Sequence, residues 1–169
     1  MDVRDVLTDL FGRVEEHVDE VLDGLDTASL THQPAPGTNP IGWLVWHIAR
    51  VEDAQFAELV GEDQLWVTGP WAARFGLDPD PANHGYAHTP ADVAAVRPES
   101  VDALREYARA ARARTDAFLA TLTEGELDRI VDEAWDPPVT MGVRLISIAD
   151  DQIQHLGAAA YVKGLLERS

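Results

Sequence analysis

Apolar residues recur at spacings of three and four along most of the chain, which is the repeat of an amphipathic helix. Similar repeats predict long helices from Pro40 to about Val60, from Ser100 to about Leu122, and from Met141 to about Glu167. No convincing alternating strand pattern interrupts them. An earlier helix, from about Asp2 to Asp26, has its apolar face at Val3, Leu7, Leu10, Val14, Val18, Val21 and Leu25. Four long helices in 169 residues predict an all-α fold, a four-helix bundle.

Prolines and glycines set the limits of these helices. Residues 31–38 contain two prolines and a glycine and cannot continue the first helix. We expect Asn39 to cap the second helix, with Pro40 at its first position and Gly61 as its C-terminal stop. A capping-box pattern at 123–126 predicts a short helix that runs through Ile130.

A long connection, residues 62–99, joins the second and third predicted helices. It carries five prolines and two tryptophans, Trp66 and Trp71. A connection of this length is usually a binding loop, a lid or a crossover that carries short helical turns, and Thr89-Pro90 begins one such turn. The tryptophans either wall a substrate pocket or anchor the connection on the bundle. His84 and His88 either close over a pocket or are solvated loop residues.

The charge of the chain excludes several classes of partner. There are 30 Asp and Glu against 13 Lys and Arg, a net charge of −17, which disfavours nucleic acid and anionic membrane surfaces. Cysteine is absent, so disulfides, thiolate zinc sites and a cysteine nucleophile are excluded. No run of about 18 apolar residues or basic, apolar leader is present. We expect a single cytoplasmic domain spanning residues 1–169.

The last predicted helix has ionisable residues on its apolar face. A helical wheel places Asp151 and His155, spaced i and i+4, in the centre of that face. His47 faces inward in the same way from the second helix. Two imidazoles and one carboxylate from facing helices are the ligand set of an open metal site, such as zinc with water or a 2-His-1-carboxylate iron site. The alternative is a hydrogen-bonded Asp151–His155 core pair beside a buried His47. Arg144, on the same stripe, is either a counter-ion to Asp151 or reaches out of the bundle end.

Two segments resemble motifs of the DinB-like superfamily. Residues 39–49 read NPIGWLVWHIA and are similar to its second-helix signature. Residues 151–157 read DQIQHLG and are followed by YVKG at 161–164; together they are similar to its final-helix motif. The superfamily includes mycothiol-dependent maleylpyruvate isomerases and related mycothiol and bacillithiol S-transferases, which are four-helix bundles that hold a divalent metal. Helix order and the long connection extend the resemblance over essentially the whole chain.

The resemblance implies a ligand set. His47 matches the first metal ligand, Asp151 the ligand four residues before the last, and His155 the last. Position 151 is His in much of the superfamily and Glu in the mycothiol isomerase branch, so Asp is a departure and one methylene shorter than Glu. The implied cofactors are a divalent metal, zinc first with nickel, iron or manganese as alternatives, and mycothiol as a co-substrate.

Two functions follow for this sequence. The first is a metal-dependent S-transferase or isomerase that joins a small-molecule thiol to an electrophile. The thiol is suggested by composition: a single lysine and many Ala, Arg, Asp and Pro residues are typical of a GC-rich, actinobacterial type of genome, in which mycothiol is the available thiol. The second is a non-catalytic bundle that stores metal, senses a ligand or serves as a dimeric interaction domain. The resemblance also implies a homodimer, for which Trp46 and Phe56, away from the His47 face, leave room. We assign His17 to packing.

Overall fold

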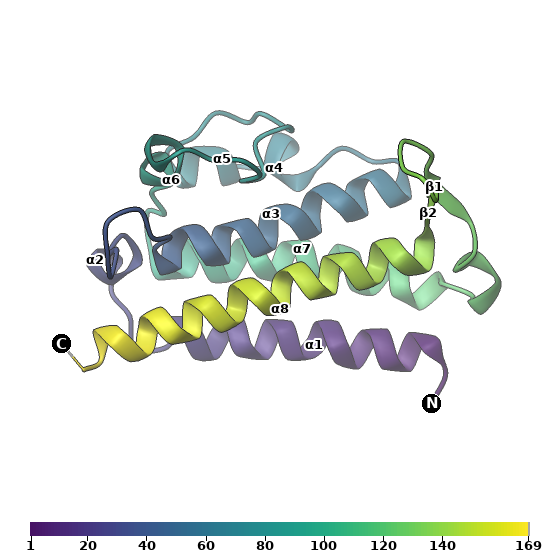
Figure 1. Cartoon of the computed structure of the whole chain (residues 1–169), viewed down its shortest axis with the longest axis horizontal. Coiled ribbons are helices and arrows are strands. Elements are labelled where there is room, and N and C mark those ends of the chain that lie inside the picture. Colours follow the sequence, from purple (N-terminus) through teal and green to yellow (C-terminus); the bar gives the residue numbers. More distant parts are fainter. Residues whose placement is uncertain (169) are drawn as a thin grey trace.

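Four long helices make up the body of the molecule in a computed structural model that describes residues 1–168 (Figure 1). They are α1 (Val3–Leu22), α3 (Ile41–Val60), α7 (Val101–Thr121) and α8 (Met141–Leu166). The all-α, four-helix-bundle prediction is therefore confirmed. The shorter elements between them are α2 (Thr27–Leu30), α4 (Leu65–Thr68), α5 (Trp71–Arg74), α6 (Pro90–Ala95), the 3₁₀ helix η1 (Glu124–Glu126), β1 (Ile130–Asp132) and β2 (Val139–Thr140).

The directions of the long helices explain the long connection. α3 contacts both α7 and α8, and α1 contacts the same two helices, so α3 and α1 lie on opposite corners of the bundle. Figure 1 shows α3 and α7 running in one direction and α1 and α8 in the other. A chain that leaves α3 and enters the parallel neighbour α7 must return along the whole helix, about 30 Å for 20 residues. Residues 61–100 make that return.

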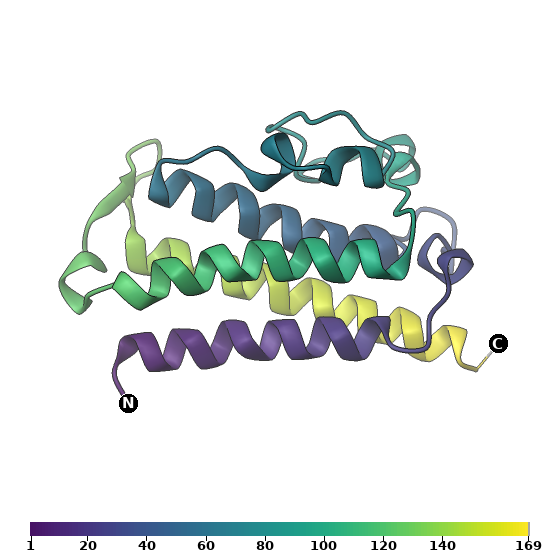
Figure 2. The same ribbon diagram turned by 180° about the vertical axis from the view of Figure 1, so that it is seen from behind.

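The connection covers the side of α3 that faces away from α1, as the views from both sides show (Figures 1 and 2). α4, α5 and α6 are the short helical turns expected in this segment, and α6 begins with the capping box of Thr89 and Asp92. Trp66 is fully buried against Trp46 and Tyr107, and Trp71 packs on Tyr107. The tryptophans thus anchor the connection on the bundle. Because α7, α8 and the connection all cover α3, residues 41–50 are buried throughout.

The chain near α2 departs from the prediction. α1 ends at Leu22 rather than near residue 26, because Asp23 is extended and Gly24 adopts a left-handed φ of 74°. Asp26 then accepts a hydrogen bond from the amide of Ser29 and caps α2. The expected cap of the second helix was also wrong, since Pro40 itself is the N-cap of α3 and makes no side-chain cap bond.

The segment before α8 contains strands that the apolar pattern did not reveal. The capping box at 123–126 is present, but the helix it begins is only η1, so the helix predicted through Ile130 is wrong. Ile130 instead starts β1, which pairs antiparallel with β2. Strands of three and two residues are too short to establish an alternating pattern.

Trp46 and Phe56 lie in the interior of the bundle, not on a free face of α3. Both side chains are fully buried, Trp46 against Trp66 and Phe56 against Phe11 and Phe118. The expectation that they leave room for a dimer interface is therefore wrong. In the part of the chain that the structure describes, every helix is too short or too polar to cross a membrane.

Candidate metal centre

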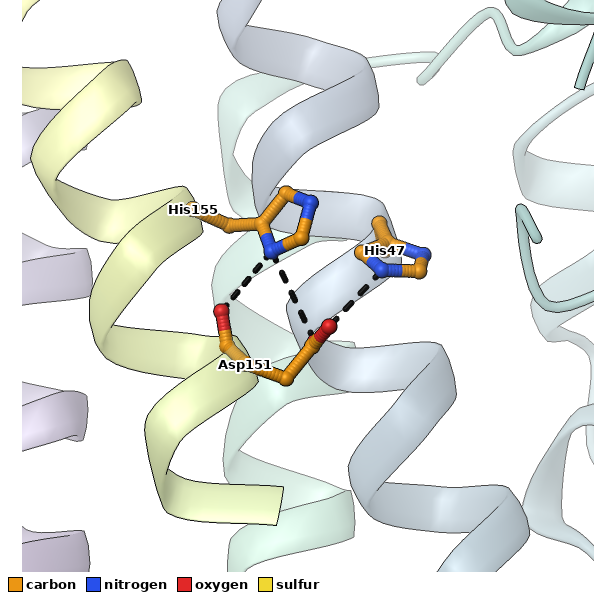
Figure 3. A group of neighbouring side chains, drawn as sticks. All are labelled: His47, Asp151 and His155. Carbon is orange, nitrogen blue, oxygen red and sulfur yellow. Dashed lines mark hydrogen bonds and ion pairs between the residues drawn. The ribbon is translucent and has the colours of Figure 1, made fainter. Parts of the chain in front are cut away.

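His47, Asp151 and His155 come together between α3 and α8 (Figure 3). One ligand-type atom from each side chain lies within 4.8 Å of the other two. His47 is on the second turn of α3, and the other two are one turn apart in the middle of α8. The side chain of His47 is 8% exposed, whereas Asp151 and His155 are 34% and 25% exposed. The group is thus closed on the α3 side and open to solvent on the α8 side.

The imidazole of His47 is fixed on one face and at one nitrogen. It stacks on Trp43 with the ring planes 7° apart and the centroids at 4.9 Å. Its Nδ1 lies 2.6 Å from the backbone oxygen of His84. A carbonyl oxygen can only accept, so Nδ1 carries the proton and Nε2 presents a lone pair in the neutral ring. That nitrogen faces Asp151.

Asp151 has a buried oxygen that no donor in the described residues satisfies. Its Oδ2 lies 3.5 Å from Nε2 of His47 and 3.6 Å from Nδ1 of His155, and it has no hydrogen-bond partner within residues 1–168. Partial burial would raise the pKa of the carboxyl, but a proton taken up by the imidazole of His47, or beyond it by those of His155 and His84, favours the carboxylate and lowers this pKa below its usual value. Asp151 is therefore a carboxylate at neutral pH.

His155 is held by its own helix rather than by the Asp151 carboxylate. Its Nδ1 lies 2.7 Å from the backbone oxygen of Asp151, four residues earlier. By the same reasoning as for His47, Nε2 is its unprotonated nitrogen. The two rings are tilted by 57° with their centroids 4.4 Å apart. A hydrogen-bonded pair of the Asp151 and His155 side chains, one alternative from the sequence, is not formed.

These features fit a divalent cation. Two neutral imidazoles and a carboxylate are the donor set of an open zinc site, and atoms about 2.1 Å from a tetrahedral ion lie about 3.4 Å from each other. Nε2 of His47 and Oδ2 of Asp151 lie 3.5 Å apart, close to that value. Both are acceptors, so a cation between them would satisfy the orphaned carboxylate oxygen. That they bind a metal stays a prediction.

The segment at 83–88 closes the back of the centre. Besides the His84 oxygen, Gly85 approaches so closely that a Cβ there would lie 2.5 Å from Nδ1 of His47. Gly85 also has φ +101°, a conformation that L side chains rarely adopt. Metal-ligating histidines usually donate their second nitrogen to such a backbone carbonyl, which fixes the ring orientation. Gly85 and the His84 carbonyl supply this support.

Arg50 holds the same segment in place. Its guanidinium is fully buried and donates to the backbone oxygens of Asn83, at 3.0 Å, and Pro81, at 3.3 Å. Asp53, also fully buried, balances the charge of Arg50 and accepts from the backbone amides of Leu65 and Trp66 at 2.8 Å. Arg50 thus holds the beginning of the segment that supports His47, and Asp53 holds the beginning of α4.

The other histidines do not join the group. His88 accepts from Trp43 Nε1 at 3.1 Å through Nδ1 and contacts Asn83 Oδ1 at 2.9 Å through Nε2, so both its nitrogens are used. Burial lowers the pKa of His84 and that of His88, so both rings are neutral at pH 7. Neither is a fully solvated loop residue. His17 contacts Glu20 and is 58% exposed, so its assignment to packing is wrong.

Arg144 does not serve as a counter-ion to Asp151. Its guanidinium donates to Gln55 at 2.5 Å, to Glu58 at 3.0 Å and to Asp132 at 3.1 Å. It therefore reaches toward the end of α3 and the β1 strand, in line with the second alternative drawn from the sequence.

Some of the supporting residues leave partial signals in the sequence. An Asn-His-Gly run in a proline-rich connection marks a turn, and a glycine there is a sign of close backbone approach. Arg50 and Asp53 lie among apolar residues of a helix, where unpaired charges are costly. Neither signal says which residue of the connection is contacted.

Comparison with known proteins identifies the family. The family model of the DinB superfamily matches residues 10–159. A crystal structure of a conserved protein from Enterococcus faecalis is similar, with 33% sequence identity, a TM-score of 0.91, and coverage of 100% of this chain and 99% of that one. No curated protein matches the chain. The chain belongs to the DinB superfamily.

Proposed function

We propose that the protein binds a divalent metal ion, zinc first with nickel, iron or manganese as alternatives, through His47, Asp151 and His155. The single observation that carries this proposal is the buried Oδ2 of Asp151, which has no hydrogen-bond partner in the described residues and lies 3.5 Å from Nε2 of His47. An unsatisfied buried carboxylate oxygen is costly unless a cation compensates it.

We further propose that the centre serves a small-molecule thiol, mycothiol first, in an S-transferase or isomerase reaction. A divalent ion with an open coordination position lowers the pKa of a thiol and holds it as a thiolate. In a transfer, the sulfur gives an electron pair to an electrophilic carbon, the leaving group departs with the pair of the broken bond, and the thiol proton passes to solvent. The chain contains no cysteine, so the sulfur must come from a cofactor.

The residues of the chain have distinct parts in this proposal. His47 is held immobile by Trp43 and the His84 oxygen, so it fixes the position of the centre. Asp151 contributes the negative charge, and with His155 it lies on the solvent-accessible side, where thiol and electrophile would enter. His84 and His88 are held in hydrogen bonds or buried, so they supply no obvious general base.

Because neither of these two histidines is a free base, a second candidate is a non-catalytic bundle that stores metal or senses a ligand. Metal analysis of the purified protein and of His155→Ala tests the first step. We expect one metal ion per chain in the wild type after supplementation with zinc, nickel, iron or manganese, and at least a tenfold weaker affinity in the variant. No stoichiometric metal in the wild type would end the enzyme proposal.

Thiol-conjugate formation separates catalysis from storage. Mycothiol and a reactive electrophile such as a chlorinated dinitrobenzene are incubated with metal-loaded wild type and with His155→Ala, and the conjugate is followed by absorbance. Catalysis requires conjugate formation that depends on both the metal and His155. Stoichiometric metal without conjugate from a range of thiols and electrophiles would favour the storage or sensing function.

The resemblance also implies a homodimer, which we propose to form through the outer face of α8. Val143, Ile146, Ile153 and Tyr161 are at least half exposed along this helix. Scattered exposed apolar residues are ordinary, but a row along one helix indicates an interaction surface. Light scattering on Ile146→Asp/Ile153→Asp should give a monomer where the wild type gives a dimer. Val6→Asp, at an equally exposed position on α1, is the control.

A further inference from the structure

A layer of polar side chains crosses the interior of the bundle between two apolar clusters. One cluster contains Trp43, Trp46 and Leu156, and the other contains Phe56, Leu119 and Ile148. On each of α3, α7 and α8 the layer occupies a position between the two clusters. Its members are Glu52, Thr115 and Gln152, which are 4%, 0% and 0% exposed.

Glu52 joins the three helices in this layer. Its Oε1 accepts from the hydroxyl of Thr115 at 2.6 Å, and its Oε2 accepts from Nε2 of Gln152 at 2.7 Å. Burial raises the pKa of Glu52 to about 7, although both hydrogen bonds and the charge of Arg112 oppose this shift. Apolar side chains of similar volume often replace such a buried polar contact at no loss of stability. Stability alone therefore does not explain why Glu52, Thr115 and Gln152 are buried together.

The position of Gln152 on α8 offers an explanation. Gln152 directly follows Asp151 and precedes His155 by three residues, so it lies on the same turn as the candidate ligands. Adjacent residues of a helix differ by about 1.5 Å along the axis and 100° around it. A contact that fixes Gln152 against α3 therefore fixes the height and rotation of both ligands.

The contact between Glu52 and Gln152 joins α3 and α8, the two helices that carry the candidate ligands. α3 and α8 run antiparallel (Figure 1), and His47 and Glu52 face successive levels of α8. Arg144 makes a third polar contact further along, with Gln55 and Glu58, but near the end of the bundle. Oε1 of Gln152 has no hydrogen-bond partner in residues 1–168. Within that part of the chain, Glu52 alone forms a hydrogen bond with the side-chain amide of Gln152.

We propose that Glu52 is a positioning residue for the candidate metal centre: through Gln152 it holds Asp151 and His155 of α8 opposite His47 of α3. The proposal rests on the proposed function for its biological meaning. The juxtaposition itself is a property of the metal-free protein, and it can be measured without metal.

The test compares wild type with Glu52→Gln, which keeps both hydrogen-bonding positions, and with Glu52→Leu/Gln152→Leu, which turns the contact apolar. Leu119→Ala, a buried change in the cluster containing Phe56, is the control for loss of stability. Two readouts are used. One is the nuclear Overhauser effect between the ring protons of His47 and His155 in metal-free protein, and the other is zinc affinity by competition with a chelating dye.

We expect wild type, Glu52→Gln and Leu119→Ala to show the ring-to-ring effect and to bind zinc within threefold of one another. The double leucine variant should fold, lose the effect and bind zinc at least tenfold more weakly. Retention of both properties by the double variant would overturn the proposal, and so would their loss in Leu119→Ala or Glu52→Gln. A wild type that binds no zinc refutes the proposed function, while the effect in metal-free protein still decides this inference.

Discussion

Single residues around His47 have little freedom to change. Gly85 combines φ +101° with a contact that leaves no room for a Cβ beside Nδ1 of His47. A side chain at position 85 is therefore disfavoured both by the backbone conformation and by the ring of His47. Among the glycines of the described residues, Gly85 alone combines the two limits, so it tests the support of the centre directly.

Gly85→Ala should weaken zinc binding at least tenfold and cost about 1–3 kcal/mol of unfolding free energy, because it adds backbone strain and displaces the His47 ring. Gly125→Ala is the matched control, since a Cβ there meets nothing within 4 Å. Urea denaturation and a dye-competition titration measure the two effects. Equal behaviour of the two variants would refute the role of Gly85.

Glu52 should make stability depend on pH. Its folded pKa of about 7 lies above the value of 4.5 for a free side chain, so the folded state retains a proton that the unfolded chain loses. The stabilising contribution of protonated Glu52 to the free energy of unfolding is fully present below pH 4.5 and is lost as the pH rises through 7. The free energy of unfolding should fall by up to about 3 kcal/mol over this window.

Chemical denaturation of metal-free protein from pH 4.5 to 8 measures this dependence. Glu52→Gln cannot titrate, so its stability should fall less with rising pH than that of the wild type, and the difference should centre between pH 4.5 and 7. Parallel profiles for the two proteins would show that Glu52 is ionised normally.

Buried charges join the connection to the bundle. Asp53 accepts from Tyr107 at 2.9 Å and Arg114 at 3.1 Å, besides the two amides at the start of α4. One carboxylate therefore links α3, α7 and the connection. Removing one member of such a network leaves the other charges buried without compensation.

Asp53→Ala should cost about 3–5 kcal/mol of unfolding free energy, because Arg50 then loses its buried counter-ion. Hydrogen exchange of the Leu65 and Trp66 amides should accelerate, since Asp53 is their acceptor. Glu62→Ala removes only an exposed partner of Arg114 and should cost under about 0.5 kcal/mol. Comparable losses in the two variants would contradict the central place of Asp53.

The candidate ligands lie on two helices that are about 100 residues apart in the sequence. A cation held by His47, Asp151 and His155 would cross-link α3 and α8, and it would bind only the folded state. Ligand binding of this kind adds about 2.7 kcal/mol of stability at 100 times the dissociation constant.

Zinc at that concentration should therefore raise the melting temperature of the wild type by about 5–10 °C. His155→Ala should show no such shift. His17→Ala, which removes an exposed histidine of α1 outside the group, should respond like the wild type. Differential scanning calorimetry distinguishes the variants, and a shift retained in His155→Ala would place the metal elsewhere.

The repeat of apolar residues determined the four long helices, their approximate limits and the inward direction of His47, Asp151 and His155. These features are local, since helical periodicity alone decides which side chains share a face. The motifs on the second and last helices also pointed to the DinB superfamily, which the comparisons confirm.

Tertiary structure decided how these faces meet and what supports them. Which helices run parallel, and therefore why the connection must cross back over α3, depends on the packing of the whole bundle. The His84 oxygen and Gly85 reach His47 from some 40 residues away, and Glu52 reaches Gln152 from 100 residues away. Contacts between residues so distant in sequence leave no periodic trace, so only the folded chain reveals them.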